Sequence, residues 1–258
     1  MRYYVSSITD VISEEADGDW EKLTYVDRTA ELVSANGLGI ELAEFCISDN
    51  MDNSYEDVLP HVLKNCEASP DRTLHAPYNE LFPMAIEPLV VEVAYKRYVQ
   101  TLDYCKRFGA KKMIVHANYT EALYFPNWFI KRHIDFWKRF LAENDLGDVV
   151  ICVENVQEED PDLILGILKG VEDPRLRMCL DVGHANLSDT EPIEWECRAE
   201  QGYILANWHG QHNALLGLDF LAVADAGNAS AHIDNTRRDS ASREVGNAYA
   251  SRRNTTND

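Results

Sequence analysis

The segment Cys179–Leu187, CLDVGHANL, places two side chains that could do chemistry at the end of an apolar run. Asp181 closes the run, and His184 follows after Val182 and Gly183. A carboxylate and an imidazole at this spacing can bind a divalent metal ion or transfer a proton. If other apolar runs end in the same kinds of residue, a shared site becomes the first hypothesis.

Three further strand-like runs end in a histidine or a carboxylate, namely Arg72–His75, Lys112–His116 and Val149–Glu154. A single histidine at a strand end is more often a hydrogen-bonded structural residue than a metal ligand, because such ends tolerate polar groups. Glu154 is stronger evidence, since a buried carboxylate must be paired or bound to something. Together with Asp181, these residues predict a site for a divalent metal ion such as zinc, manganese, iron or cobalt.

The strands that must position these residues alternate with amphipathic helical segments. We expect strands at Tyr3–Ile8, Leu38–Phe45, Arg72–His75, Lys112–His116, Val149–Glu154 and Leu176–Asp181. The expected helices are a segment ending at Asn36–Gly37, then Glu87–Phe108, Asn127–Leu141 and Asp162–Leu168, with Ile193–Trp195 starting another. Strands that are apolar on both faces and alternate with helices form a parallel sheet covered by helices.

The predicted fold class is α/β, a (β/α)8 TIM barrel whose last two units are uncertain or degenerate, because the strand–helix units fill about 195 residues and leave about 60. A doubly wound open sheet is the alternative, but no glycine-rich phosphate loop follows the first strand. In a parallel barrel all strands end on one face, where the following loops build the active site. The residues expected near that face are His75, His116, Glu154, Asp181, His184, Glu41 and Glu44.

Composition limits the partners. The 258 residues carry a formal net charge of -20, which opposes a phosphate backbone, so we expect no nucleic acid partner. No apolar run approaches the roughly 20 residues of a membrane span, and MRYYVSSITDVISEE lacks the apolar part of a signal peptide. We therefore expect a cytoplasmic protein with no membrane partner. The 6 cysteines form no CxxC pair, so reduced thiols are expected.

Four short motifs, in order along the chain, resemble those of the xylose-isomerase-like TIM-barrel superfamily. They are HAPY at His75–Tyr78, IVHANY at Ile114–Tyr119, VEN at Val153–Asn155 and DVGHAN at Asp181–Asn186. The superfamily includes sugar phosphate isomerases and epimerases, inositol-catabolism enzymes and the endonuclease IV branch. The resemblance is specific for the superfamily and much less so for a reaction.

The resemblance implies roles for residues at the matching positions. Glu154 and Asp181 resemble the two metal-binding carboxylates of the superfamily, and Glu154 also resembles the catalytic base of the epimerase branch. His184 resembles a histidine that contacts substrate or metal. His75 and His116 resemble histidines that bind metal in the endonuclease branch and line the pocket elsewhere. The residues expected to contact the substrate are His75, His116, Asn155, His184 and Glu44.

The chain departs from the superfamily pattern in its last quarter. Members usually supply a metal-binding histidine from the seventh strand, for which His212 or alternatively His209 is the candidate, and a glutamate from the eighth, for which none stands on a strand. Residues 222–258 are too polar for a buried strand and its helix. We expect a TIM-barrel domain at residues 1–221 and a polar tail, disordered or irregular, at 222–258. Either the reading frame shifts after Trp195, or the C-terminus is genuine and divergent.

Three functions fit these observations. The first is a metal-dependent sugar or sugar phosphate isomerase or epimerase, in which Glu154 removes a proton next to a carbonyl and a divalent metal ion stabilises the enediolate. The second is an endonuclease IV-like phosphodiesterase, which the net charge opposes. The third is an inactive barrel remnant that binds metal or sugar weakly. Outside the site, we expect His61 and His133 on the surface and Gln157–Asp162 in a solvated loop that opens a helix.

Overall fold

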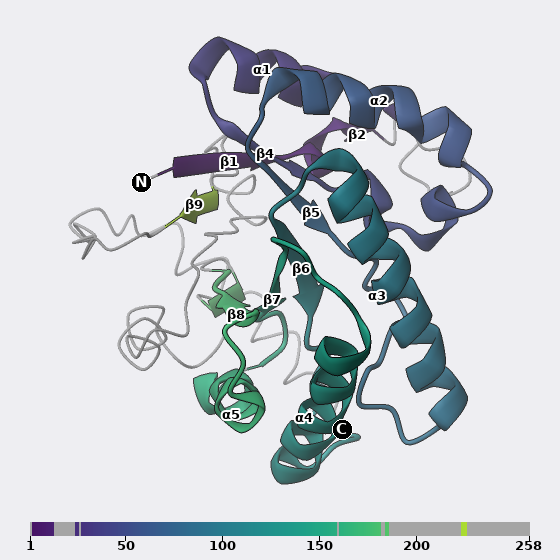
Figure 1. Ribbon diagram of the computed structural model, residues 1–258, viewed down its shortest axis with the longest axis vertical. Helices are drawn as coiled ribbons and strands as arrows, with labels where there is room; N and C mark the ends of the chain where they lie inside the picture. Colours follow the sequence, from purple (N-terminus) through teal and green to yellow (C-terminus); the bar gives the residue numbers. More distant parts are fainter. Residues whose placement is uncertain are drawn as a thin grey trace, which may run out of the picture.

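The computed structural model describes residues 2–12, 24–25, 27–158, 160–181, 184–185 and 223–225. Within them, one sheet has the strand order β8-β7-β6-β5-β4-β1-β9 (Figure 1). Its strands are β1 (Arg2–Ser6), β4 (Gly39–Leu42), β5 (Arg72–His75), β6 (Lys112–His116), β7 (Val150–Glu154), β8 (Leu176–Cys179) and β9 (Val223–Asp225). Neighbours from β1 to β8 pair in parallel, whereas β9 pairs antiparallel with β1. The short strands β2 (Val11–Ile12) and β3 (Thr24–Tyr25) pair separately.

Helices alternate with the parallel strands, as the sequence predicts. They are α1 (Arg28–Asn36), α2 (Tyr55–Ala68), α3 (Pro88–Phe108), α4 (Pro126–Glu143) and α5 (Pro161–Val171). Figure 1 shows α1 and α2 beside the β1–β4 end of the sheet, while α3, α4 and α5 follow its remaining strands. No helix in the described ranges is long and apolar enough to cross a membrane.

The parallel strands are buried on both faces. In β6, Met113 and Val115 join the large hydrophobic core shared with the helices. Ile114 instead groups with Cys152 and Cys179 in a second, smaller cluster. Because successive side chains of a strand point to opposite faces, this second cluster lies on the side of the sheet away from the helices. A strand buried on both faces reads as a continuous apolar run, which is why the sequence reveals these strands so directly.

The core-facing side of α4 carries the aromatic residues that the helical pattern predicts. Phe129, Phe136, Trp137 and Phe140 are all buried, and Trp137 stacks on Tyr98 of α3 with ring centroids 5.6 Å apart.

His133 lies on the same side of α4, so its predicted surface position is wrong. The side chain is 0% exposed, and its Nε2 lies 3.0 Å from the carbonyl oxygen of Ala117, to which it donates. Its spacing from Phe129 and Phe136 by one helical turn each way explains the burial. His61, also expected on the surface, is half-buried beside Asp27 at 2.8 Å.

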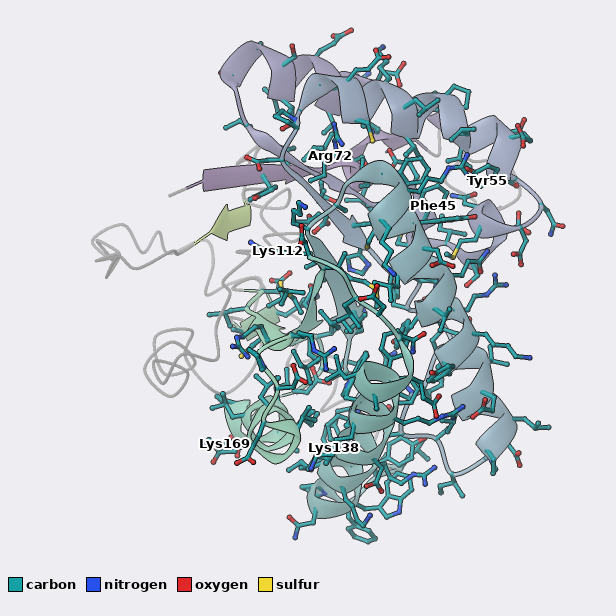
Figure 2. The ribbon with its side chains drawn as sticks, viewed as in Figure 1. Phe45, Tyr55, Arg72, Lys112, Lys138 and Lys169 are labelled. Carbon is teal, nitrogen blue, oxygen red and sulfur yellow. The ribbon has the colours of Figure 1, made fainter. Side chains whose placement is uncertain are left out.

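Arg72, at the start of β5, ties two helix ends to the sheet (Figure 2). Its guanidinium donates hydrogen bonds to the carbonyl oxygens of Cys66 in α2, at 2.6 Å, and Phe108 in α3, at 2.8 Å. Gly109 follows α3 with φ 70°, a left-handed conformation that favours glycine. In Figure 2, Phe45 and Tyr55 lie side by side nearby, and their rings stack at 6.0 Å. The Arg72 hydrogen bonds thus connect the C-terminal parts of α2 and α3 to the start of β5.

Some predictions fall outside the described residues, including the helix start at Ile193–Trp195 and the candidates His209 and His212. Of the predicted tail, residues 222–258, the structure describes β9. The division of the chain at residue 221 stays a prediction. Within the described residues, Cys46, Cys66 and Cys105 are free cysteines.

Candidate functional site

Three predicted ligands end neighbouring strands on the face away from the helices. His116 of β6 pairs in register with Glu154 of β7, and His75 of β5 pairs with Ile114, two residues before His116. Since side chains alternate along a strand, all three point to one face. Their exposed fractions are 2% for His75, 8% for His116 and 0% for Glu154, so bulk water has little access to them.

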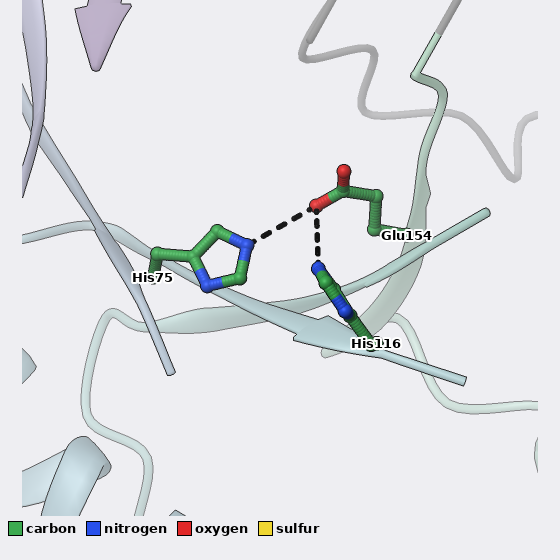
Figure 3. Close-up of side chains that lie close together, drawn as sticks. All are labelled: His75, His116 and Glu154. Atoms are coloured by element: carbon green, nitrogen blue, oxygen red, sulfur yellow. Dashed lines mark ion pairs between the residues drawn. The ribbon is translucent and has the colours of Figure 1, made fainter. Parts of the chain in front are cut away.

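Glu154 lies against both histidines (Figure 3). Its Oε2 is 3.4 Å from Nε2 of His75 and 3.7 Å from Nε2 of His116. Nδ1 of His75 lies 2.7 Å from the carbonyl oxygen of Ala76. A carbonyl oxygen only accepts, so Nδ1 carries the proton and donates it, and Nε2 is the nitrogen directed at Glu154. A histidine held in this way through one nitrogen is typical of a metal ligand.

Tyr78 packs against both imidazoles and is a site residue that sequence reasoning missed. Its ring stacks on His116 with centroids 4.5 Å apart, and it meets His75 edge-on at 5.6 Å. Burial raises the pKa of the Tyr78 hydroxyl, and the charge of nearby Glu154 adds to the effect. The HAPY motif contains Tyr78, but spacing alone gave it no role.

Glu154 also belongs to a second group, with Asp181 and His184. In each group one possible ligand atom from every residue lies within 4.8 Å of the others. Nε2 of His184 is 3.6 Å from Oδ2 of Asp181, and the backbone N–H of His184 donates to Oδ1 of Asp181 at 2.8 Å. The structure thus brings together His75, His116, Glu154, Asp181 and His184.

Asn155, predicted to contact the substrate, is 1% exposed and bonds to the backbone of Asp181. Its Oδ1 accepts from the Asp181 N–H at 2.7 Å, and its Nδ2 donates to the Asp181 carbonyl oxygen at 2.9 Å. Both the oxygen and the nitrogen of the Asn155 amide are therefore hydrogen-bonded to the backbone of Asp181.

Glu158 is an exception to the expectation that Gln157–Asp162 is a solvated loop that opens a helix, since Gln157, Asp160 and Asp162 are exposed and α5 begins at Pro161. The side chain is 3% exposed, and its carboxylate accepts hydrogen bonds from the backbone N–H of Tyr119 at 2.9 Å and of Val156 at 2.7 Å. Burial raises the pKa of Glu158, and the backbone donors partly offset this. Glu158 joins the loop after β6 to the loop after β7, next to two ligand-bearing strand ends. In the charge-rich run, no sequence signal marks Glu158 as a buried carboxylate.

Glu44 lies in neither ligand group. Its Oε1 accepts a hydrogen bond from Nδ2 of Asn65 at 2.6 Å, and burial raises the pKa of Glu44 to about 7. The predicted seventh-strand ligand, His212, lies outside the described residues.

The donor chemistry fits a divalent transition metal. Imidazole nitrogens and carboxylate oxygens together suit zinc, manganese, iron or cobalt. Parallel strands alternating with helices, with such residues gathered at the carboxyl ends of the strands, are typical of the TIM-barrel fold. Residues 32–210 match the family described as xylose isomerase-like TIM barrel, and the chain belongs to that family. The predicted superfamily is therefore confirmed.

Solved structures similar to this chain include sugar epimerases. The D-psicose 3-epimerase with D-tagatose from Clostridium cellulolyticum H10 has a TM-score of 0.59 and 14% identity, over 79% of this chain and 71% of that one. An IolI protein with a zinc atom has a TM-score of 0.58 and 16% identity, over 78% and 69%. A D-tagatose 3-epimerase-like protein has a TM-score of 0.55 and 16% identity, over 81% and 76%. At these identities the likeness shows the fold alone. No curated protein matches the chain.

Proposed function

We propose that this protein is an isomerase or epimerase of a small sugar or sugar phosphate. The observation that carries the proposal is the position of Glu154, a fully buried carboxylate at a strand end that is shared by both ligand groups. Membership of the family and the sugar epimerases among similar structures support it.

In this proposal Glu154 accepts a proton from a carbon next to the substrate carbonyl. Such a base must lie within hydrogen-bond reach of the proton it removes. An isomerase returns the proton from Glu154 to the neighbouring carbon, whereas an epimerase needs a second acid, on the opposite face of the substrate, to protonate the same carbon; no described residue is assigned to that role. The burial of Glu154, His75 and His116 would limit the amount of water around the deprotonated substrate.

The remaining site residues bind and orient. Glu154 and Asp181, with His184 and the predicted ligand His212, would hold a divalent cation, whose Lewis acidity polarises the carbonyl group. His75 and His116 would contact substrate hydroxyl groups through Nε2. Tyr78 holds both rings in place by packing against them.

The convergence of His75 and His116 on Glu154 favours a second candidate, an endonuclease IV-like phosphodiesterase. Two further nitrogens beside the shared carboxylate would suit a site with more than one metal ion. The net charge of -20 opposes a nucleic acid substrate, so this candidate ranks behind the first. A barrel that only binds metal or sugar weakly is the third candidate.

Metal content tests the proposal first. The full chain, its Glu154→Gln variant and the control Glu56→Gln, an exposed position on α2, are purified and measured by elemental mass spectrometry. We expect near-stoichiometric manganese, zinc, iron or cobalt in the wild type and the control, and much less in Glu154→Gln. No metal uptake by the wild type, even after reconstitution, would overturn the catalytic proposal.

Proton exchange tests the reaction. The metal-loaded wild type is incubated in D2O with a panel of ketoses, aldoses and their phosphates, and deuterium next to the carbonyl is followed by NMR. We expect exchange with at least one sugar, lost in Glu154→Gln and kept in Glu56→Gln. A loaded protein that exchanges no proton but cleaves phosphodiester bonds in DNA would overturn the first candidate in favour of the second.

A further inference from the structure

Asn155 lies between two ligand-bearing strands at the point where their hydrogen-bond ladder stops. The last residues paired between β7 and β8 are Glu154 and Cys179. Beyond them, the Asn155 amide accepts from the Asp181 N–H at 2.7 Å and donates to the Asp181 carbonyl oxygen at 2.9 Å. A side-chain amide thus continues the ladder by one step, in place of a backbone peptide.

We infer that Asn155 is a positioning residue, which sets the Asp181 carboxylate beside Glu154 and does not recognise the substrate. The inference rests on the proposed metal-dependent function, since it assigns Asn155 its effect through the ligand Asp181. The amide is 1% exposed, and both its oxygen and its nitrogen are engaged with one residue's backbone. A substrate hydroxyl would have to displace these bonds in order to reach it.

The position of Asp181 affects two of the proposed metal ligands, its own carboxylate and the side chain of His184. Oδ1 of Asp181 accepts from the backbone N–H of His184 at 2.8 Å, and the Asp181 carbonyl oxygen accepts from the N–H of Ala185 at 2.9 Å. The backbone N–H groups of His184 and Ala185 are therefore both bonded to Asp181, and Asp181 is bonded to Asn155. Loss of an outer residue that orients a metal ligand typically weakens metal affinity about 10–100-fold.

Cobalt binding by the full chain tests this inference, because Co2+ bound to protein ligands absorbs in the visible range and the spectrum reports the ligand geometry. Asn155→Leu removes both hydrogen bonds at similar size, and Asn155→Ser removes them with less crowding. The matched control is Asn50→Leu. Asn50 is also a buried asparagine, 5% exposed, whose Nδ2 donates to the Glu44 carbonyl oxygen at 2.6 Å, outside both ligand groups.

We expect both Asn155 variants to bind Co2+ about 10–100-fold more weakly than the wild type, with an altered visible spectrum. Asn50→Leu is expected to lower the melting temperature while it keeps the affinity and the spectrum. If Asn155→Leu does not fold, Asn155→Ser carries the test.

If the wild type binds Co2+ and an Asn155 variant binds it with unchanged affinity, this inference is overturned. Substrate binding would then be the remaining role for the Asn155 amide. An equal loss in Asn50→Leu would overturn it too, because the effect would then come from general destabilisation. A wild type that binds no Co2+ would overturn the proposed metal-dependent function itself, so the two failures are distinguishable.

Discussion

Glu44→Gln is expected to stabilise the protein above neutral pH relative to the wild type. Glu44 is 2% exposed, and burial raises its pKa from an ordinary 4.5 to about 7. Because the folded-state pKa is raised, the protonated side chain contributes stability below pH 4.5, and this contribution is lost as the pH rises through about 7. The folded and unfolded pKa values differ by about 2.5, and a difference of one in pKa corresponds to ~1.4 kcal/mol. The stability lost between pH 4.5 and pH 8 is therefore about 3 kcal/mol. A glutamine at this position does not titrate.

The assay is urea unfolding of both proteins, followed by tryptophan fluorescence from pH 4.5 to pH 8. The free energy of unfolding of Glu44→Gln minus that of the wild type should rise by about 3 kcal/mol across this range. The constant part of the difference, from altered contacts with Asn65, does not depend on pH. Glu56→Gln, at an exposed position of α2, should show no comparable rise. A difference that stays flat for Glu44→Gln would refute the reasoning, since it would mean that the carboxyl group ionises freely in the folded protein.

Three further predictions concern buried residues. Burial lowers the pKa of His133 to about 4, so its contribution to stability is present above pH 6.5 and is lost as the pH falls through about 4. His133→Gln should therefore gain about 3 kcal/mol on the wild type between pH 7 and pH 4 in the same assay, and an equal pH dependence would contradict this. Trp137→Ala should lower the free energy of unfolding by about 3–5 kcal/mol, because Trp137 is 0% exposed and its truncation leaves a cavity. Gly39→Ala should cost about 1–3 kcal/mol, and a neutral result would mean that Tyr4 moves freely. The new Cβ would lie 2.3 Å from Cδ1 of Tyr4, whose ring is buried.

Strands such as Lys112–His116 could be predicted closely because burial on both faces leaves a largely apolar run. Predicted and observed ranges coincide at Arg72–His75 and Lys112–His116. The strand expected at Leu176–Asp181 ends earlier in the structure, at Cys179. Beyond that point, the Asn155 side-chain amide forms two hydrogen bonds with the backbone of Asp181. A run of residue types does not reveal where side chains replace backbone in a ladder.

The burial of His133 was indicated by its spacing along the helix, but the charged residues next to it led to the opposite prediction. Its spacing from Phe129 and Phe136 placed it on the apolar face of α4, yet charged neighbours favoured the surface. Glu158 carried no such signal, because its burial depends on backbone N–H groups of another loop, at Tyr119. Local patterns describe one element at a time, and both errors concern contacts between elements.

The sequence by itself determined the family, the alternation of strands and helices, and the ends at which His75, His116, Glu154 and Asp181 stand. The family followed from the resemblance of four motifs, and the arrangement of strands followed because hydrophobic periodicity and parallel pairing leave few other arrangements for such strands. Only the tertiary structure decided which of these side chains meet. Glu154 lies in both ligand groups while Glu44 faces Asn65, since register and loop hydrogen bonds act across residues distant in the chain.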